Sequence, residues 1–353
     1  MNNILFMLSD FYMEADSGLK KIEGETELLG ELCVNRVAGI AYLNLKKLVN
    51  LHVIKEFENT LKAVYLDNLK RTQHYKKNVR MISKLLENVS FPYALLKGAY
   101  LTTNIYKEGC RTSNDLDILI EEENVSSLQD ILKADGFIQG YYMKNEDRIV
   151  PSSRRDIILS KMNYGETVPF AKSIEGNSFY VDINFSVDFK PEKEKRTVSE
   201  LLSSIEKVEY EDTYYYTLDK YAFLIHLCCH LYKEATTMEW VKEGRDLQLY
   251  KFSDINVYLC NRDKAYFDEL LANIEKMQLV KECYYTIANT LIIYPGLKDN
   301  KDLMDFVEKL RPDNLGFMKE IVDPRENKLY QYSLSFEEWF NVKKKEEFLS
   351  EVK

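Results

Sequence analysis

The segment Ser113-Asn114-Asp115-Leu116-Asp117-Ile118-Leu119-Ile120 sets two aspartates among four large aliphatic residues. The aliphatic run predicts a buried strand, in which aspartate is uncommon. Residues i and i+2 of a strand point to one face, so Asp115 and Asp117 present two carboxylates together, opposite to Leu116. Two anions held that close repel each other unless a cation lies between them, and hard oxygen ligands suit Mg²⁺. The alternative is an edge strand with one solvated face.

Two flanking segments extend this argument. Residues 91–96 read as a short apolar strand, followed by Lys97, Gly98 and a helix-compatible run over 99–106. A strand that breaks at glycine into a helix can hold a phosphate, because backbone amides and the helix dipole favour an anion, and Lys97 adds a positive charge. Downstream, residues 178–185 form an apolar strand pattern that carries Asp182. Together these residues predict Mg²⁺-dependent nucleotidyl transfer.

The stretch from Leu95-Leu96-Lys97-Gly98 to Arg111-Thr112-Ser113-Asn114-Asp115-Leu116-Asp117 resembles the DNA-polymerase-β-like nucleotidyltransferase superfamily, especially its poorly characterised bacterial branch. Residues 35–38, 226–230 and 244–247 are also similar to that branch, so the likeness covers most of the chain. The resemblance implies a phosphate-holding turn and three carboxylates that are both catalytic and metal-binding. The implied nucleotide-binding residues are Lys97, Gly98, Arg111 and Ser113, and the implied carboxylates are Asp115, Asp117 and Asp182.

The chain departs from the pattern of this superfamily in two places. The common turn is Gly-Gly or Gly-Ser, whereas here it is Gly98-Ala99, with no hydroxyl for a phosphate. The third carboxylate is assigned to Asp182 because the strand around it alternates, and Asp188 follows six residues later. Triphosphate binding at the turn and the choice between Asp182 and Asp188 therefore stay open at this point.

Composition and charge limit the classes of protein to consider. A chain of 353 residues with 45% hydrophobic residues is long enough for two or three units with a sizeable core. The net charge of −9, from 48 basic and 57 acidic residues, argues against a general nucleic-acid-binding surface. No apolar run is long enough for a transmembrane span, and residues 1–8 read as a first amphipathic helix rather than a signal peptide. The six cysteines show no Cys-x-x-Cys spacing, which is typical of reduced thiols in a cytoplasmic protein.

The period of the hydrophobic pattern changes twice along the chain. It indicates an N-terminal helical region over residues 1–88, a nucleotidyltransferase core over 89–190 and a C-terminal helical region over 191–353. The predicted class is α+β, a small twisted sheet flanked by two helical regions. Within the core we expect a helix from about residue 125 to 134, ended by Asp135-Gly136, and further strands from residues 157–162 and 167–171.

His226 and His230 stand four residues apart, so they share one face of a helix. Their neighbours are apolar and no zinc-protease motif surrounds them, so a structural or substrate-pocket role is favoured over metal binding. Arg245-Asp246 follows a short distance on. Ionised carboxylates cannot pack against apolar side chains, so we expect a cleft between the sheet and the C-terminal helices. This cleft would take the acceptor, with His226, His230 and Arg245 near its wall.

Two classes of function follow. The first is an enzyme that moves a nucleoside monophosphate from an NTP to a hydroxyl or phosphate of a small molecule, with Mg²⁺, or Mn²⁺ in its place, as cofactor. A protein side chain or an RNA end is the alternative acceptor, and the acidic charge disfavours RNA. The second class is a non-catalytic partner protein that kept the fold. The aspartates argue against it, because an anionic cluster without a function costs stability.

Overall fold

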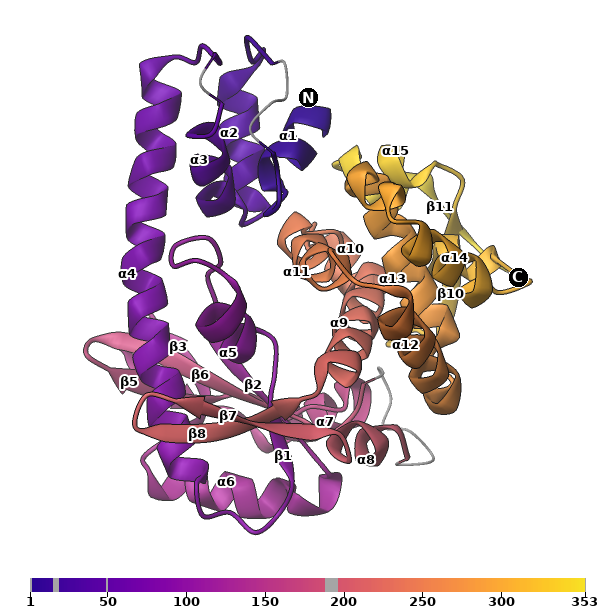
Figure 1. Ribbon diagram of the computed structural model, residues 1–353. Coiled ribbons are helices and arrows are strands. Elements are labelled where there is room, and N and C mark those ends of the chain that lie inside the picture. The colour runs from indigo at the N-terminus through magenta and orange to yellow at the C-terminus, as the bar shows by residue number, and fades with distance from the viewer. Residues whose placement is uncertain (1, 15–18, 49, 188–195, 353) are drawn as a thin grey trace. The chain divides into compact units, whose positions relative to one another are not determined.

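The computed structural model describes residues 2–14, 19–48, 50–187 and 196–352. The chain forms two compact units (Figure 1). The first, which we call the helical unit, contains residues 1–70, 109–111 and 224–353, and the second, the sheet unit, contains residues 71–108 and 112–223. The long helix α4 (Lys55–Leu86) contributes residues 55–70 to the helical unit and 71–86 to the sheet unit. The three regions that the sequence indicates are thus distributed over two units.

The described part of the helical unit also carries the 3₁₀ helices η3 (Pro295–Asp299), η4 (Gly316–Lys319) and η5 (Lys345–Phe348). A small antiparallel sheet of order β11-β10-β9 is formed by β9 (Glu320–Asp323), β10 (Lys328–Tyr332) and β11 (Leu349–Glu351). Among the described helices, none is both long and apolar enough to cross a lipid bilayer. The helices that lie wholly or mainly in this unit are α1 (Asn2–Ser9), α2 (Glu25–Val34), α3 (Ala38–Leu45), α9 (Lys220–Ala235), α10 (Met238–Lys242), α11 (Leu249–Leu259), α12 (Lys264–Met277), α13 (Val280–Ile293), α14 (Lys301–Leu310) and α15 (Phe336–Asn341).

The sheet unit is built on a six-stranded sheet of order β1-β2-β6-β5-β3-β4. The pair β2–β6 is parallel, and the other neighbours are antiparallel. The strands are β1 (Tyr93–Leu95), β2 (Asp115–Ile120), β3 (Ile138–Met143), β4 (Arg148–Pro151), β5 (Phe170–Ile174), β6 (Asn177–Asn184) and the separate hairpin β7 (Ile205–Tyr210) and β8 (Thr213–Leu218). Besides the second half of α4, the described helical elements are α5 (Gly98–Tyr100), the π-helix η1 (Leu101–Ile105), the 3₁₀ helix η2 (Glu122–Asn124), α6 (Val125–Ala134), α7 (Arg154–Tyr164) and α8 (Arg196–Leu202). The predicted α+β class, with a small sheet between helical stretches of sequence, is confirmed.

One apolar cluster holds the sheet unit together. Leu116 and Ile118 of β2 and Val181 of β6 are buried completely, and they pack with α6 and the second half of α4. Burying a side chain of this size stabilises the fold by about 1.5–3 kcal/mol. The buried side chains that α4 and α6 contribute to the cluster are Tyr75, Val79, Ile82, Leu86, Val125, Leu128 and Leu132. The alternation along β2 therefore turns one face of the strand into core and leaves the other to its aspartates.

The expectation of a strand over residues 157–162 is wrong. These residues lie inside helix α7, which begins after Ser153, whose side chain accepts a hydrogen bond from the Asp156 amide. The helix ends at Gly165, which has φ 60° and ψ 26°. A serine N-cap and a left-handed glycine C-cap are ordinary signals of helix ends. The apolar residues between Ser153 and Gly165 also fit a strand pattern, which led to the wrong prediction. The expected helix over residues 125–134 is confirmed as α6.

A buried ion pair joins distant segments of the helical unit. Arg111 donates from Nε and Nη2 to both carboxylate oxygens of Asp254 on α11, with nitrogen–oxygen distances between 2.8 and 3.1 Å. Arg111 is 7% exposed and Asp254 is 3% exposed. A fork of this geometry satisfies both charges at once, and losing one partner leaves the other stranded in the interior.

We therefore expect Asp254→Ala to destabilise the protein by about 3–5 kcal/mol, because the Arg111 guanidinium loses its buried counter-charge. Urea unfolding followed by circular dichroism measures this loss. Asp268→Ala is the matched control, since Asp268 pairs with Lys264 on the surface and should contribute about 1 kcal/mol or less. Similar small losses in both variants would contradict a stabilising role for the buried pair.

Candidate functional site

The pairing of β2 with β6 gathers the predicted carboxylates. Strands β2 and β6 lie side by side in the sheet (Figure 1). Asp115 and Asp117 lie two residues apart on β2, and Asp117 stands directly opposite Asp182 of β6 in the parallel register. Side chains that are in register on neighbouring strands point to the same face, and such strands are about 4.8 Å apart. Three aspartates thus share one face of the sheet, while the apolar residues between them face the core. Asp188 lies outside the described residues.

The groups around Asp182 change its pKa. Burial raises the pKa of Asp182 well above its usual range, and the negative charges of Asp115, Asp117 and Glu166 raise it further. The positive charge of Lys97 acts in the opposite direction. Each carboxylate therefore makes the ionisation of Asp182 more costly, and a cation at this face reduces that cost.

Lys97 supplies positive charge to this face. Its Nζ donates a hydrogen bond to Oδ1 of Asp117 at 2.7 Å, and Nδ2 of Asn184 donates to the same oxygen at 3.3 Å. Asp117 is 7% exposed. A buried carboxylate needs such partners in order to stay ionised. Lys97, predicted from the sequence as a nucleotide-binding residue, is thus bound to one of the catalytic candidates.

The backbone turn after β1 is strained. Lys97 has φ 44° and ψ −111°, in a region that residues other than glycine rarely adopt. The α-helix that follows has three residues, and it continues as the π-helix η1. The amide of Ala99 donates to the carbonyl of Leu96, and the amide of Leu101 donates to the carbonyl of Lys97. These two amides are therefore already used by the turn, and phosphate binding at Gly98 stays a prediction.

Gly98 is needed because of close packing. A Cβ added there would lie 2.1 Å from Oγ of Ser113, 2.7 Å from its Cβ and 2.9 Å from the Tyr75 hydroxyl. Ser113, also predicted to bind the nucleotide, thus lies against the glycine of the turn. The two halves of the Lys-Gly and Asp-x-Asp motif are therefore packed against each other.

Sequence reasoning missed two residues at this face. Glu166 forms an isolated antiparallel bridge with Asn184, and its charge raises the pKa of Asp182. Tyr141 on β3 is half-exposed, and its pKa is raised by burial and by the charges of Asp182 and Glu166. Neither residue stands in a recognisable motif, because pairing between distant strands brings them to the aspartates.

The remaining candidates lie in the helical unit. Arg111 is held by Asp254 there, and its predicted contact with a nucleotide is untested. The His226 and His230 rings on α9 stack with centroids 6.5 Å apart, and Nε2 of His230 lies 3.5 Å from Oε2 of Glu234. The exposed Arg245 lies over the Trp240 ring, 4.8 Å from its centroid. Asp246, its neighbour in sequence, bonds instead to Lys345 at 2.5 Å.

The carboxylate groups of the aspartate face are suitable ligands for a divalent cation. Carboxylate oxygens are the donors that Mg²⁺ and Mn²⁺ prefer, and the mutual repulsion described above favours adding positive charge. Among the described residues, however, no three His, Cys, Asp or Glu side chains are gathered closely enough to hold a metal ion. Asp117, the central member, instead directs Oδ1 to Lys97. The donor set therefore fits a metal, and its side chains must regroup to bind one.

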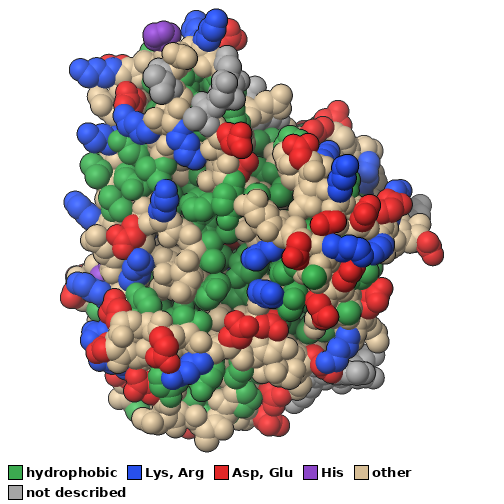
Figure 2. Space-filling model, in the orientation of Figure 1, with side chains coloured by type: hydrophobic (Ala, Val, Ile, Leu, Met, Phe, Trp, Pro, Cys, Tyr) green, Lys and Arg blue, Asp and Glu red, His purple; other side chains and the backbone are tan. Residues whose placement is uncertain are grey.

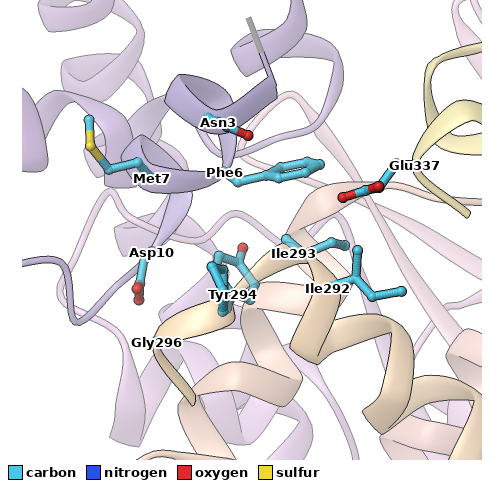
Figure 3. Close-up of a pocket in the computed structure, with 10 residues that line it drawn as sticks. Asn3, Phe6, Met7, Asp10, Ile292, Ile293, Tyr294, Gly296 and Glu337 are labelled. Carbon is cyan, nitrogen blue, oxygen red and sulfur yellow. The ribbon is translucent and has the colours of Figure 1, made fainter. Parts of the chain in front are cut away.

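The helical unit also contains a cavity of about 300 Å³ (Figure 3). Phe6 of α1 and Ile292 and Ile293 of α13 form its apolar wall, and the carboxylates of Asp10 and Glu337 are part of its lining. None of the predicted site residues lines this cavity.

We expect Gly98→Ala to destabilise the sheet unit by about 1–3 kcal/mol, because its Cβ collides with Ser113. The double variant Gly98→Ala/Ser113→Gly removes the two closest atoms and should recover most of the loss. Urea unfolding of the two variants and of Ser113→Gly alone measures this coupling. Additive losses would show that the strain arises elsewhere.

Asp182→Asn should stabilise the metal-free protein at neutral and alkaline pH. The pKa of Asp182 is raised above its ordinary value of 3.8 in the folded state, so the wild-type protein loses stability as rising pH forces this group to ionise. The advantage of the variant should therefore be largest near pH 8 and shrink towards pH 4. Thermal unfolding in EDTA at both pH values measures it, with the exposed Asp130→Asn as the control. A stability advantage of Asp182→Asn that grew towards acid pH would contradict a raised pKa of Asp182.

Comparison with known proteins identifies the family of the chain. The model of a family described as uncharacterised nucleotidyltransferase matches residues 25–294, a range that includes every candidate site residue named above. No curated protein and no solved structure matches the chain. The family match covers most of the 353 residues and agrees with the resemblance seen in the sequence. The chain therefore belongs to the uncharacterised nucleotidyltransferase family and is a phosphorus-transferring enzyme.

Proposed function

We propose that this enzyme transfers a nucleoside monophosphate from ATP or another NTP to a hydroxyl or phosphate of a small molecule. In this reaction an acceptor oxygen forms a bond to the α-phosphorus, the bond from that phosphorus to the leaving oxygen breaks, and pyrophosphate departs. The observation that carries the proposal is the alignment of Asp117 with Asp182, beside Asp115, on one face of the sheet.

We propose Mg²⁺, with Mn²⁺ as a substitute, as the cofactor, held by Asp115, Asp117 and Asp182. A bound divalent ion supplies positive charge to the phosphate oxygens and orients them for in-line displacement. The chain's own residues do the rest. Asp182 lies in register with Asp117, and we propose that it also accepts the proton of the attacking hydroxyl. Lys97 offers an ammonium group for the phosphates.

Charge supports a small acceptor over a nucleic acid. Figure 2 shows acidic and basic side chains interspersed over the face in view, and the net charge is −9. Binding to a phosphate backbone relies on concentrated positive charge. None of the six cysteines, all of which lie among the described residues, forms a disulfide bond, which supports the cytoplasm as the proposed location. Roles of His226, His230 and Arg245 towards the acceptor stay predictions.

Asp117→Asn should reduce nucleotide transfer by about a hundredfold or more, because it removes a charge from the group that stabilises the phosphates. The assay incubates the protein with each α-³²P-labelled NTP, Mg²⁺ and a cell extract, and follows the label into small molecules, protein or RNA. Asp130→Asn on α6 is the control and should retain full activity. An undiminished rate in Asp117→Asn would reject the catalytic role of Asp117. Label found on RNA or protein would show that the acceptor is not a small molecule.

A further inference from the structure

The Lys97–Asp117 contact is an interior ion pair. Its nitrogen and oxygen are 2.7 Å apart, and the two side chains are 16% and 9% exposed. Removing charges from water is costly, so a buried pair of this kind is weak evidence for a purely stabilising role. The position of the pair therefore calls for another explanation.

The backbone at Lys97 adds an independent observation. Lys97 has φ 44°, a conformation that costs a residue with a side chain of the order of 1–3 kcal/mol. The same turn is fixed by the Gly98–Ser113 packing and by the Leu101 amide bonding to the Lys97 carbonyl. The turn thus holds a lysine in an unfavourable conformation next to the aspartate face, and such strain concentrates at functional sites.

Charge balance gives the third observation. The charges of Asp115, Asp117 and Glu166 all act on Asp182, and the Lys97 ammonium bonds to Asp117 at the same face. A divalent ion bound to Oδ1 of Asp117 at about 2.1 Å would lie next to the Lys97 ammonium and repel it strongly. The Lys97 ammonium and the metal ion therefore cannot both bind Oδ1 of Asp117 at the same time.

We propose that Lys97 takes the place of the divalent cation in the metal-free enzyme. It bonds to Asp117 until the metal displaces it, and its released ammonium then turns to the triphosphate that arrives with the metal. This inference rests on the proposed function and deepens it, because Lys97 acts first as a competitor of the metal and then as a phosphate ligand. It also explains why the described aspartates do not form a closed metal site as they stand.

The first test measures metal binding without nucleotide. Lys97→Met keeps most of the side-chain volume and removes the charge. We expect its melting temperature in EDTA to fall below that of the wild type, because Asp117 loses its partner. We also expect its apparent affinity for Mn²⁺, from the melting temperature during titration, to rise about tenfold or more, since one removed neighbouring charge is worth one or more pKa units.

Lys172→Met is the matched control for this titration. Lys172 belongs to the same unit and pairs with Asp135 at 2.9 Å. On β5, Ala171 is in register with Tyr180 and so shares the face of the aspartates, whereas Lys172 is in register with Phe179 on the opposite face. This variant should lose some stability and respond to Mn²⁺ like the wild type. An unchanged or weaker Mn²⁺ affinity in Lys97→Met would overturn the proposal.

The second test uses the native protein, so it does not depend on the variant folding. An amine-reactive acylating reagent labels lysines, and mass spectrometry compares Lys97 with Lys172 with and without saturating Mn²⁺. We expect slow labelling of Lys97 without metal and several-fold faster labelling with it, while Lys172 stays constant. Labelling of Lys97 that is unchanged or slower with Mn²⁺ would overturn the proposal.

The two ideas fail in different experiments. The transfer assay with Mg²⁺ or EDTA tests the proposed function, and neither metal-binding test contains a nucleotide. Active, Mg²⁺-dependent enzyme together with unchanged Lys97 labelling would reject the Lys97 exchange alone. Exchange of Lys97 by Mn²⁺ in a protein without transfer activity would support the exchange and reject the proposed reaction.

Discussion

The parallel pairing of β2 with β6 is the constraint on which the site depends. One register places Asp117 opposite Asp182 and leaves Leu116 opposite Val181, so a single set of backbone hydrogen bonds fixes both the acidic face and the core beneath it. A shift by one residue would bury the aspartates and expose the aliphatic side chains. The apolar cluster therefore stabilises the arrangement that the chemistry needs, although the aspartates themselves repel one another.

The sequence predicts much of this face because its signals are local. Alternation reveals Asp115 and Asp117 as neighbours on one strand face, and the same pattern picks out Asp182. The helix α6 and the change from helical to strand periodicity are equally visible. The error over residues 157–162 is of the same local kind, because the end signals at Ser153 and Gly165 outweigh an apolar run that fits a strand.

Other features escape sequence reasoning because they join segments far apart in the chain. Glu166 reaches the aspartates through a bridge to Asn184, and nothing near it marks it as a site residue. Arg111 stands close to the aspartates in sequence, yet its guanidinium binds Asp254, 143 residues away. The ion pair between Lys97 and Asp117 is also invisible, since a lysine before glycine reads as a phosphate ligand. Spacing gives proximity only within an element, and tertiary pairing decides the rest.

The division of the chain into units bears on the order of synthesis. The sheet unit uses residues 71–223 apart from three, whereas the helical unit needs residues 1–70 together with residues 224–353. Domains fold as units while the ribosome extends the chain from its N-terminus. The sheet unit can therefore fold soon after residue 223 emerges, whereas helix α1 gains its packing against α11 only when residues 249–259 follow. During that interval the face of α1 that packs against α11 lacks its final partner.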